Sequence, residues 1–374
     1  MPQYKSNQIR SNNRPKLEAA MYEEAHRANL TFSEWLEYKA TTESHGDSNF
    51  SGWFNPDLRD ERGKKLDAYE QALLAYGIRV SGPTAQTGDA FFHTPDSRVL
   101  FPEYIERTWR YAQSEATNEL RVADLVAATV TINSGAYTGE YLDEDQIVPL
   151  LPVEQGEPIP QVVVKHHTQS IRLQKYGVVL AMTYEAIRRS QLPLLTAFIQ
   201  KVALDTRRAQ ARQAVLTLVN GDGNSNPAPN TAVASPGLWT LGDIIDLMLD
   251  FTDSYEPNLL VADEDTVLRQ LLKMDLYTGS DTTAEGGNFR DTGSFPSPLG
   301  MTLKYIRDVP EMAEPEKLLA VDTRFALVEV REENAQLTET DRLIQTQFER
   351  VALSEVLGFS KLMTAASRTK TNPS

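Results

Sequence analysis

The apolar and polar positions between residues 176 and 223 predict the end of a strand, a short helix and a long helix. Pro193 suits the first turn of the long helix, and Asn220 with Gly221 supplies a cap at its end. A helix of about 27 residues is roughly 40 Å long. The apolar positions predicted to form its buried face are Leu195, Phe198, Ile199, Val202, Ala209 and Leu216. No residue of the stretch has a catalytic pattern, so the helix indicates an architectural role.

The stretch before it, residues 128–182, alternates between apolar and polar positions and predicts a long two-stranded excursion. Its irregular tip is marked by Pro149, Pro152, Pro158 and Pro160. As one strand, residues 161–180 would span roughly 66 Å, against a radius of gyration of about 21 Å for a compact domain of this length. Because an isolated hairpin is marginal in water, either the strand lies on another subunit or a bend folds it back.

Residues 238–325 alternate between short helices and short strands, which is typical of an α/β domain. Its predicted helices cover 241–251 and 263–274, and its predicted strands cover 258–261, 304–306 and 317–321. The polar stretch 278–298 is a long loop, and loops of this length are usually functional or disordered. Strand patterns then return over 326–332 and 343–353, followed by an apolar segment over 356–366.

The first part of the chain, residues 1–95, is predicted to be a partly helical extension. Helices are expected over 16–29, 31–39 and 64–77, and another begins near Pro102. The glycine-rich connector 41–57 carries the aromatic residues Phe50, Trp53 and Phe54. These rings need a surface to bury against, either on this chain's own body or on a neighbouring subunit.

Composition places the chain among ordinary globular proteins. Its 374 residues are 41% hydrophobic and 24% charged, and the length allows two domains or one domain with long excursions. No cysteine is present, which excludes disulfides, thiolate zinc sites and cysteine nucleophiles and fits a reducing cytoplasm. No apolar run reaches the ~18 residues of a membrane span, and the first residues lack the apolar core of a secretory signal.

The formal net charge of −15 argues against a general nucleic-acid binder, which should carry a basic face. The first 16 residues differ from the rest, because they hold four basic residues and no acidic one. These are Lys5, Arg10, Arg14 and Lys16. Such a tip could touch nucleic acid or an acidic neighbour, or it could be a solvated terminus.

Candidate chemistry is sparse. The loop 220–231 mimics the alternating ligands of an EF-hand, but Ser225 and Thr231 stand where glycine and glutamate are required, so a capped helix end is the better interpretation. His166 and His167 are adjacent in a predicted strand and point to opposite faces. The phosphate-binding, dinucleotide-binding and nucleophile-elbow motifs are absent from the sequence. We therefore expect no catalytic, cofactor or metal site.

Five segments, in this order along the chain, resemble the major capsid proteins of tailed bacteriophages with the Hong Kong 97 fold. They are VEQGEPIP (153–160), RLQKYGVVLAMTYEAIRRS (172–190), LLTAFIQKVALDTRRAQARQAVLTLVNGDG (194–223), LGMTLKYIRDVPE (299–311) and LLAVDTRFALVEVRE (318–332). The segments are specific as a set and weak one by one. The resemblance covers residues 98–366, and the first 95 residues match no motif of the family.

The resemblance implies an α+β fold of the Hong Kong 97 type. Its parts would be an N-terminal arm (1–95), a helical segment of the peripheral domain (96–127), an extended loop (128–180), the peripheral domain with its spine helix (181–237), an axial domain (238–325) and returning peripheral strands (326–374). The extended loop would lie across a neighbouring subunit, and the loop 278–298 would approach a five-fold or six-fold axis.

Contacts between subunits are expected in the basic N-terminal segment, at the tip of the extended loop and in the loop near the axis. The residues chosen for these contacts are Arg10, Lys16, Asp143, Glu144, Glu154, Gly156, Glu157, Pro160, Phe289 and Arg290. The cluster of acidic residues that begins at Asp143 is otherwise expected to be solvated.

The resemblance further implies a shell of many copies, arranged as pentamers and hexamers, that encloses double-stranded DNA without reading its sequence. The shell would assemble in the cytoplasm of a bacterial host and form the virion, with portal, scaffolding and decoration proteins as partners and with no cofactor or membrane. Two other interpretations stay open. One is an encapsulin, a compartment of the same fold that encloses enzyme cargo, and the other is an enzyme whose site assembles only in the fold.

Overall fold

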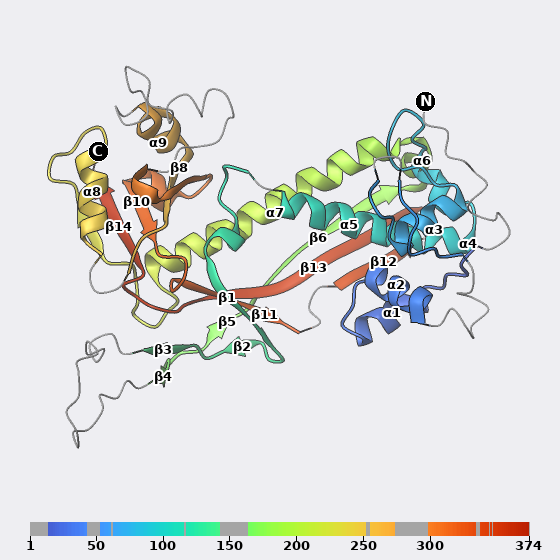
Figure 1. Ribbon diagram of the computed structural model, residues 1–374, viewed down its shortest axis with the longest axis horizontal. Helices are drawn as coiled ribbons and strands as arrows, with labels where there is room; N and C mark the ends of the chain where they lie inside the picture. The colour runs from blue at the N-terminus through green and yellow to red at the C-terminus, as the bar shows by residue number, and fades with distance from the viewer. Residues whose placement is uncertain are drawn as a thin grey trace. The chain divides into compact units, whose positions relative to one another are not determined.

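The structure is a computed structural model. It describes residues 14–42, 53–60, 63–115, 117–142, 164–251, 255–273, 298–333, 337–343, 345 and 347–373. The chain divides into two compact units (Figure 1). Unit 1 comprises Met1–Ser114, Gly177–Leu204 and Gln336–Glu355, and unit 2 comprises Glu115–Tyr176, Asp205–Ala335 and Val356–Ser374. Helices and strands occur in both units, so the α+β fold class is confirmed.

Unit 1 is mostly helical. Its helices are α1 (Ala20–Arg27), α2 (Phe32–Thr42), α3 (Ala68–Tyr76), η1 (Gly88–Phe92), α4 (Pro95–Arg98), α5 (Leu100–Ser114) and α6 (Tyr184–Arg189). The helices expected in residues 1–95 are therefore confirmed, although α1 and α3 begin later than predicted. In α3 the reason is a cap: the Asp67 carboxylate accepts from the Glu70 N–H at 2.8 Å, and the Glu70 carboxylate accepts from the Asp67 N–H at 3.1 Å.

One hydrophobic core holds the helices of unit 1 together. Ile105 and Trp109 on α5 are buried in it, as are Phe32 and Leu36 on α2. Trp53 is 6% exposed and Phe54 packs beside it, so these two aromatics bury against the chain's own body. Phe50 lies outside the described residues.

The long helix is α7 (Leu192–Asn220), 29 residues, and it ends at Gly221, whose φ of 86° favours glycine. Its existence and both ends match the prediction, but its predicted buried face is partly wrong. Leu195 and Ile199 are buried, whereas the Phe198 side chain is 64% exposed. The core contacts the ridge that runs from residue 195 through 199 to Ala203, and Phe198 lies about 100° around the helix from Ile199.

A five-stranded sheet forms the centre of unit 2, in the order β7-β14-β10-β8-β9. Its strands are β7 (Asn230–Ala232), β8 (Leu259–Asp263), β9 (Thr302–Ile306), β10 (Glu316–Val321) and β14 (Ser367–Asn372). Both of its faces are covered. Leu318 and Ala320 of β10 point to a core that also contains Ile244 of the helix α8, and Leu319 and Val321 point to the core that contains Val215 of α7. Continuous apolar runs are expected of strands buried on both faces.

The helices beside this sheet are short. They are η2 (Val122–Asp124), α8 (Leu241–Leu249), α9 (Glu264–Arg269), η4 (Leu271–Lys273), η5 (Pro298–Gly300) and α12 (Pro310–Ala313). The predicted helix over 263–274 is therefore divided, because α9 ends at Arg269. The α8 helix is confirmed, and Thr240 begins it with a capping box to Asp243.

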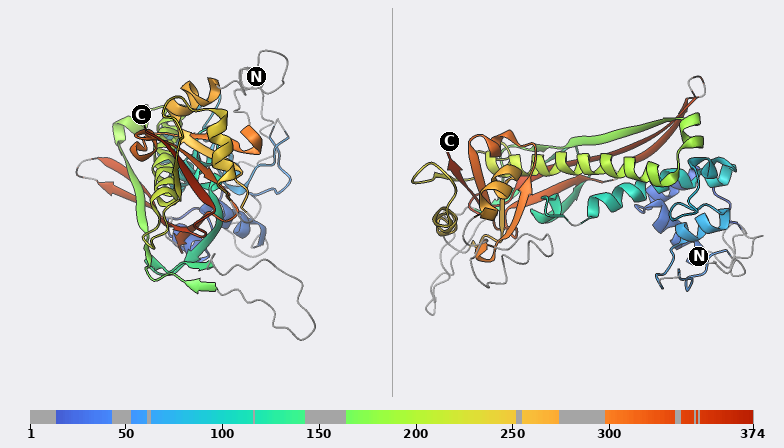
Figure 2. Two further views of the ribbon diagram at one scale, coloured as in Figure 1. Left: turned by 90° about the vertical axis from the view of Figure 1, so that its left-hand side faces the viewer. Right: turned by 90° about the horizontal axis from the view of Figure 1, so that it is seen from above.

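A second sheet contains β1 (Val126–Ile132), β6 (Gln174–Thr183), β11 (Leu327–Glu332), β12 (Leu337–Leu343) and β13 (Phe348–Lys361). The predicted strand over 343–353 is confirmed from Phe348 onward, where β13 begins, while Leu343 is the last residue of β12. The strands β11 and β12 pair with successive parts of β13. In unit 1, α7 lies along β6, as Figures 1 and 2 show, and Val178 and Leu180 of β6 pack against the core that holds Ile199.

Candidate assembly surfaces

In unit 2, the described residues of the segment predicted to be the extended loop form two short antiparallel strand pairs. They are β2 (Ala136–Tyr137) with β5 (Ile171–Arg172), and β3 (Glu140–Leu142) with β4 (Val164–His166). The two-stranded excursion is therefore confirmed in its described part. The unbroken strand over 161–180 is not formed, because β4, β5 and β6 are separate strands.

Two glycines fix the base of this loop against β13. A Cβ on Gly139 would lie 2.7 Å from the Ser360 Oγ, and a Cβ on Gly358 would lie 2.8 Å from a methyl carbon of Leu173. The Gly139 carbonyl also accepts from the His167 N–H at 2.8 Å, and the His167 ring stacks on Tyr141 with 4.6 Å between centroids. Larger residues at either glycine would push the strand pairs away from the sheet.

The loop after α7 also hydrogen-bonds to this region. The Asn224 side chain accepts from the Gln169 N–H at 3.0 Å, and the Asp222 carboxylate accepts from the Lys361 N–H at 3.0 Å. The residues that resemble EF-hand ligands therefore accept hydrogen bonds from main-chain N–H groups. This fits the interpretation of the loop as a capped helix end. Within the described ranges, no group of three or more His, Cys, Asp or Glu residues could hold a metal ion.

In unit 2, helix α8 presents an apolar outer face. Leu249 is 73% exposed and Ile245 one turn earlier is 39% exposed, and Leu238 before the helix is 77% exposed. Asp246 beside them is 60% exposed and pairs with Lys370 at 3.4 Å. Between Arg212 and Arg269 the sequence contains no Lys, Arg or His, so α8 and its flanking residues contribute no positive charge to this surface.

In unit 1, exposed apolar residues lie on three helices and also on strand β6, where Val179 is 57% exposed. Phe198 and Leu194, one turn apart on α7, are 64% and 57% exposed. Tyr111 on α5 and Tyr38 on α2 are similarly exposed. Large exposed aromatic and aliphatic side chains are what a protein interface buries at its centre.

A buried ionic cluster, which we call the Glu119 cluster, joins three elements of unit 2. The Glu119 carboxylate accepts from the Arg208 Nε at 2.6 Å and lies 3.6 Å from Arg207, both on α7. Lys304 of β9 donates to the Thr117 carbonyl at 2.5 Å. Hydrogen bonding to Glu119 raises the pKa of Arg208, and burial lowers the pKa of Lys304. The cluster binds the segment before β1 to α7 and β9, which is a structural role.

Unit 1 contains a second buried acid with a different environment, which we call the Glu103 cluster. Glu103 is 0% exposed; its Oε1 accepts from the Ser33 hydroxyl and from Arg110 at 3.4 Å, while its Oε2 is buried without a hydrogen-bond partner. Burial, and then the nearby Glu106, raise the pKa of Glu103 to about 7. A carboxyl perturbed in this way is a candidate catalytic acid when it lines a cleft.

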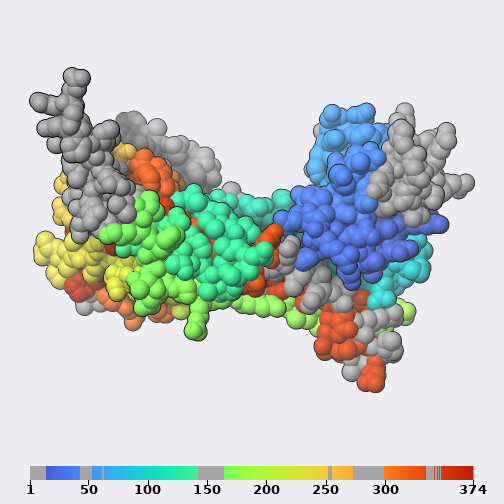
Figure 3. Space-filling model, turned by 90° about the horizontal axis from the view of Figure 1, so that it is seen from below, coloured from blue at the N-terminus to red at the C-terminus, as the bar shows by residue number. Residues whose placement is uncertain are grey.

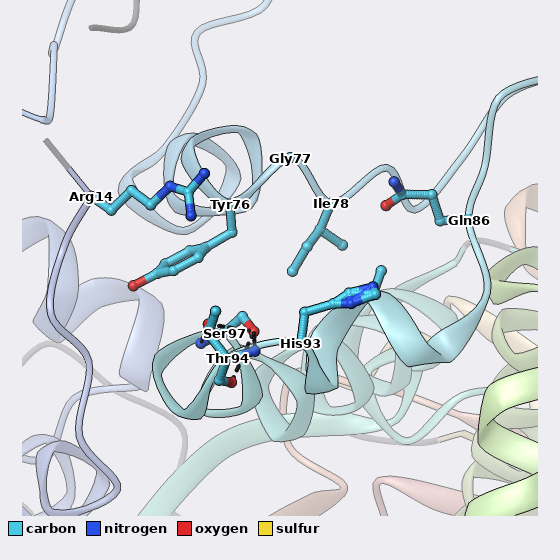
Figure 4. A pocket seen from close by; sticks show the side chains of 9 residues that line it. Arg14, Tyr76, Gly77, Ile78, Gln86, His93, Thr94 and Ser97 are labelled. Carbon is cyan, nitrogen blue, oxygen red and sulfur yellow. Dashed lines mark hydrogen bonds between the residues drawn. The ribbon is translucent and has the colours of Figure 1, made fainter. Parts of the chain in front are cut away.

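Glu103 is not among the residues that line the pocket of unit 1 shown in Figure 4. That pocket has a volume of about 150 Å³. Its lining residues are Arg14, Tyr76, Gly77, Ile78, Gln86, Ala90, His93, Thr94 and Ser97, none of them a carboxylate. The Arg14 guanidinium lies over the Tyr76 ring at 5.8 Å, and the Tyr76 hydroxyl donates to the Pro15 carbonyl. Tyr76 therefore holds the start of the described chain in place at this pocket. The residues that line the pocket include no carboxylate that could form an acid–base pair.

Of the residues chosen from the sequence as assembly contacts, the structure describes Lys16. It is exposed between Pro15 and Leu17, which are both buried in unit 1. The others, Arg10, Asp143, Glu144, Glu154, Gly156, Glu157, Pro160, Phe289 and Arg290, lie outside the described residues. The exposed apolar residues of α7 and α8 were not chosen, because exposure depends on which ridge of a helix meets the core.

A family model for phage capsid proteins matches residues 168–352. The resemblance to phage capsid proteins is confirmed. The matched region runs from the residues between β4 and β5 through α7 and α8 into β13. No curated protein sequence matches the chain.

Solved capsid and compartment structures are also similar to the chain. The capsid of the cyanophage P-SCSP1u is 11% identical, with 69% of this chain and 89% of that chain covered and a TM-score of 0.48. The capsid of a native GTA particle is 11% identical, with 70% of this chain and 95% of that chain covered and a TM-score of 0.47. The SrpI encapsulin of Synechococcus elongatus PCC 7942 is 11% identical, with 71% of this chain and 94% of that chain covered and a TM-score of 0.46. The resemblance to phage capsid proteins rests on the family model.

Among the helices that the structure describes, none is both long and apolar enough to cross a membrane.

Proposed function

We propose that this chain is the major capsid protein of a tailed phage, and that many copies of it form an icosahedral shell around double-stranded DNA. The observation that carries the proposal is the match of the phage capsid family model to residues 168–352. In this proposal residues 128–180 are the extended loop, residues 238–325 are the axial domain and residues 1–95 are the arm. The residues chosen from the sequence, Lys16 among them, are contacts between copies.

Exposed apolar surfaces support a role in assembly. Leu249 of α8 and Phe198 of α7 are well over half exposed. A closed shell needs heterologous contacts that repeat and close, and each single contact should be modest so that errors can dissociate. A few exposed side chains on each of several surfaces satisfy this requirement, because closure multiplies weak contacts into a stable whole.

The acidic surface suits a container for DNA. The chain carries a net charge of −15, and the stretch between Arg212 and Arg269 is free of basic residues. A wall with the same sign of charge as DNA would not bind the genome while it is packaged. A strongly basic inner surface in an assembled particle would contradict this part of the proposal.

The test is to express the full chain alone and together with the genes that flank it, and to measure mass by light scattering and shape by electron microscopy. Hollow icosahedral particles that protect double-stranded DNA from nuclease when made with their neighbours would support the proposal. Particles that enclose a protein cargo and no DNA would favour a compartment. A monodisperse species of 41.8 kDa under both conditions would contradict a shell protein.

A further inference from the structure

Strand β1 (Val126–Ile132) forms one edge of the second sheet. It pairs in parallel with β11, and in the part of the chain that the structure describes no strand pairs with its other side. The Ile132 carbonyl accepts from the Glu333 N–H at 2.7 Å, so Ile132 faces the β11 side. Because main-chain groups of a strand alternate in direction, the N–H groups of Thr129 and Thr131 point away from β11.

The sequence of β1, VAATVTI, offers little protection to this edge. It contains no charged residue and no proline, and five of its seven residues are β-branched. None of the seven is buried. Natural edge strands are usually blocked by charge, proline, short length or cover, since an open row of N–H and C=O groups accepts another chain. Its one such device is a register shift between Val126 and Ala128.

The other sheet of unit 2 shows that the chain does protect its edges elsewhere. The outer side of β9 is covered by the segment before η2: the Leu120 N–H donates to the Tyr305 carbonyl at 2.9 Å, and the Tyr305 N–H donates to the Asn118 carbonyl at 3.3 Å. The opposite edge strand, β7, is only three residues long. By contrast β1 has seven residues, and the stretch that contains it is at the surface, in teal, in Figure 3.

We propose that β1 accepts, along this free edge, an extended segment of a second copy of the chain. The inference rests on the proposed function and names one contact by which copies would join. The chemistry of the edge requires an extended peptide, because main-chain hydrogen bonds recognise one whatever its charge. In the proposed shell the neighbouring chains are further copies of this one, so a second copy supplies that peptide. An uncharged edge also carries no repulsion towards a partner with a net charge of −15. Along the chain β1 is followed by β2 and β3, which belong to the segment proposed as the extended loop.

Amide hydrogen exchange at single-residue resolution tests the pairing. We compare assembled particles with dissociated full-length protein, and we verify by electron microscopy that the first sample contains particles. The amides of Thr129 and Thr131 should exchange at least about tenfold more slowly in particles, while the amide of Val130, which faces β11, should be protected in both. Equal exchange of Thr129 and Thr131 in both samples, whether fast or slow, would overturn the proposal.

A pair of substitutions tests it independently. Thr131→Pro removes an N–H that points away from β11 and should reduce the yield of particles at least about tenfold. Thr131→Val keeps that N–H and the β-branched shape and should assemble like the parent chain. Equal yields from both variants would contradict strand addition. If Thr131→Pro lowers the melting temperature of the unassembled chain, the exchange experiment decides alone. Absence of particles from the parent chain would instead contradict the proposed shell function.

Discussion

The Glu103 cluster of unit 1 and the Glu119 cluster of unit 2 each bury a glutamate among arginines, and they differ in how completely the charge is satisfied. Both oxygens of Glu119 accept hydrogen bonds from Arg208, at 2.6 and 3.2 Å, and Arg207 lies 3.6 Å away. In Glu103, Oε1 has partners while Oε2 has none, and Glu106 is a second acid nearby. Burial alone therefore does not decide what a charged group does.

The Glu119 cluster is a buried ion pair that should stabilise unit 2, whereas the Glu103 cluster holds a buried carboxyl group whose charge changes with pH. A buried ion pair with good geometry is costly to break, because removing one partner leaves the other charge buried and uncompensated. A buried carboxylate with an unpartnered oxygen instead favours its neutral form, since desolvation penalises the charge. The first should hold unit 2 together, and the second should make the stability of unit 1 depend on pH.

The largest effect is expected from Glu119→Ala. The change leaves Arg207, which is 4% exposed, without its carboxylate, and should lower the free energy of unfolding by about 3–5 kcal/mol. Denaturant unfolding of the unassembled full chain measures it. Asp205→Ala is the matched control, because Asp205 is 53% exposed and lies 3.8 Å from the same Arg208, and it should cost no more than about 0.5 kcal/mol. Similar losses of unfolding free energy from both changes would show that the buried ion pair of Glu119 does not stabilise unit 2.

The next effect is expected from Glu103→Gln. Folding raises the pKa of Glu103 from 4.5 to about 7, so the folded state binds more protons than the unfolded state between these values. The parent chain should then be most stable below about pH 4.5 with respect to this group, lose about 3 kcal/mol as the pH rises to about 7, and change little above it. Glutamine is neutral throughout, so the variant should lack this slope and be the more stable protein at pH 8.

The control for this experiment is Glu23→Gln, which removes an acid of unit 1 whose side chain is 76% exposed. It should leave the slope between pH 4.5 and 7 intact. The measurement is the free energy of unfolding of the full chain at a series of pH values. If Glu103→Gln and the parent chain show the same slope, Glu103 is charged in the folded state at neutral pH and the contrast between the clusters fails.

Neither cluster could be predicted from the sequence, because the partners are distant along the chain. Ser33 and Glu103 are 70 positions apart, and Glu119 and Arg208 are 89 positions apart. Local pattern sufficed where burial is continuous: the apolar runs of β8 and β10 were predicted because both faces of each strand are covered. It failed for β14 (Ser367–Asn372), whose buried positions are polar residues that only tertiary contacts place inside.

The long helix shows the same division. Its ends were predictable, because Pro193 and Gly221 act through local backbone geometry. Its buried face was not, because apolar residues at 195, 198, 199 and 202 cover more than one side of a helix, and only the position of the core selects among them. The exposure of Phe198 is thus the kind of signal that sequence reasoning misses and that marks a candidate contact with another copy.

The smallest effect is expected from Ser33→Ala. This change sharpens the contrast between the clusters, because it removes one of the hydrogen bonds that Glu103 accepts. The Ser33 hydroxyl donates to the Glu103 carboxylate and thereby lowers its pKa against the effect of burial. Without it, the pKa of Glu103 should rise further, and the charged form should lose about 1 kcal/mol. The midpoint of the pH-dependent loss of stability should therefore move to higher pH.

Alanine also has the higher helix propensity in α2, but this gain does not depend on pH. The difference between Ser33→Ala and the parent chain at pH 8 and at pH 4 therefore isolates the hydrogen bond to the charge. The variant should be less stable relative to the parent at pH 8 than at pH 4. A difference that is the same at both values would mean that the hydroxyl serves the neutral and the charged carboxyl equally, and that the orphaned oxygen of Glu103, rather than Ser33, sets its titration.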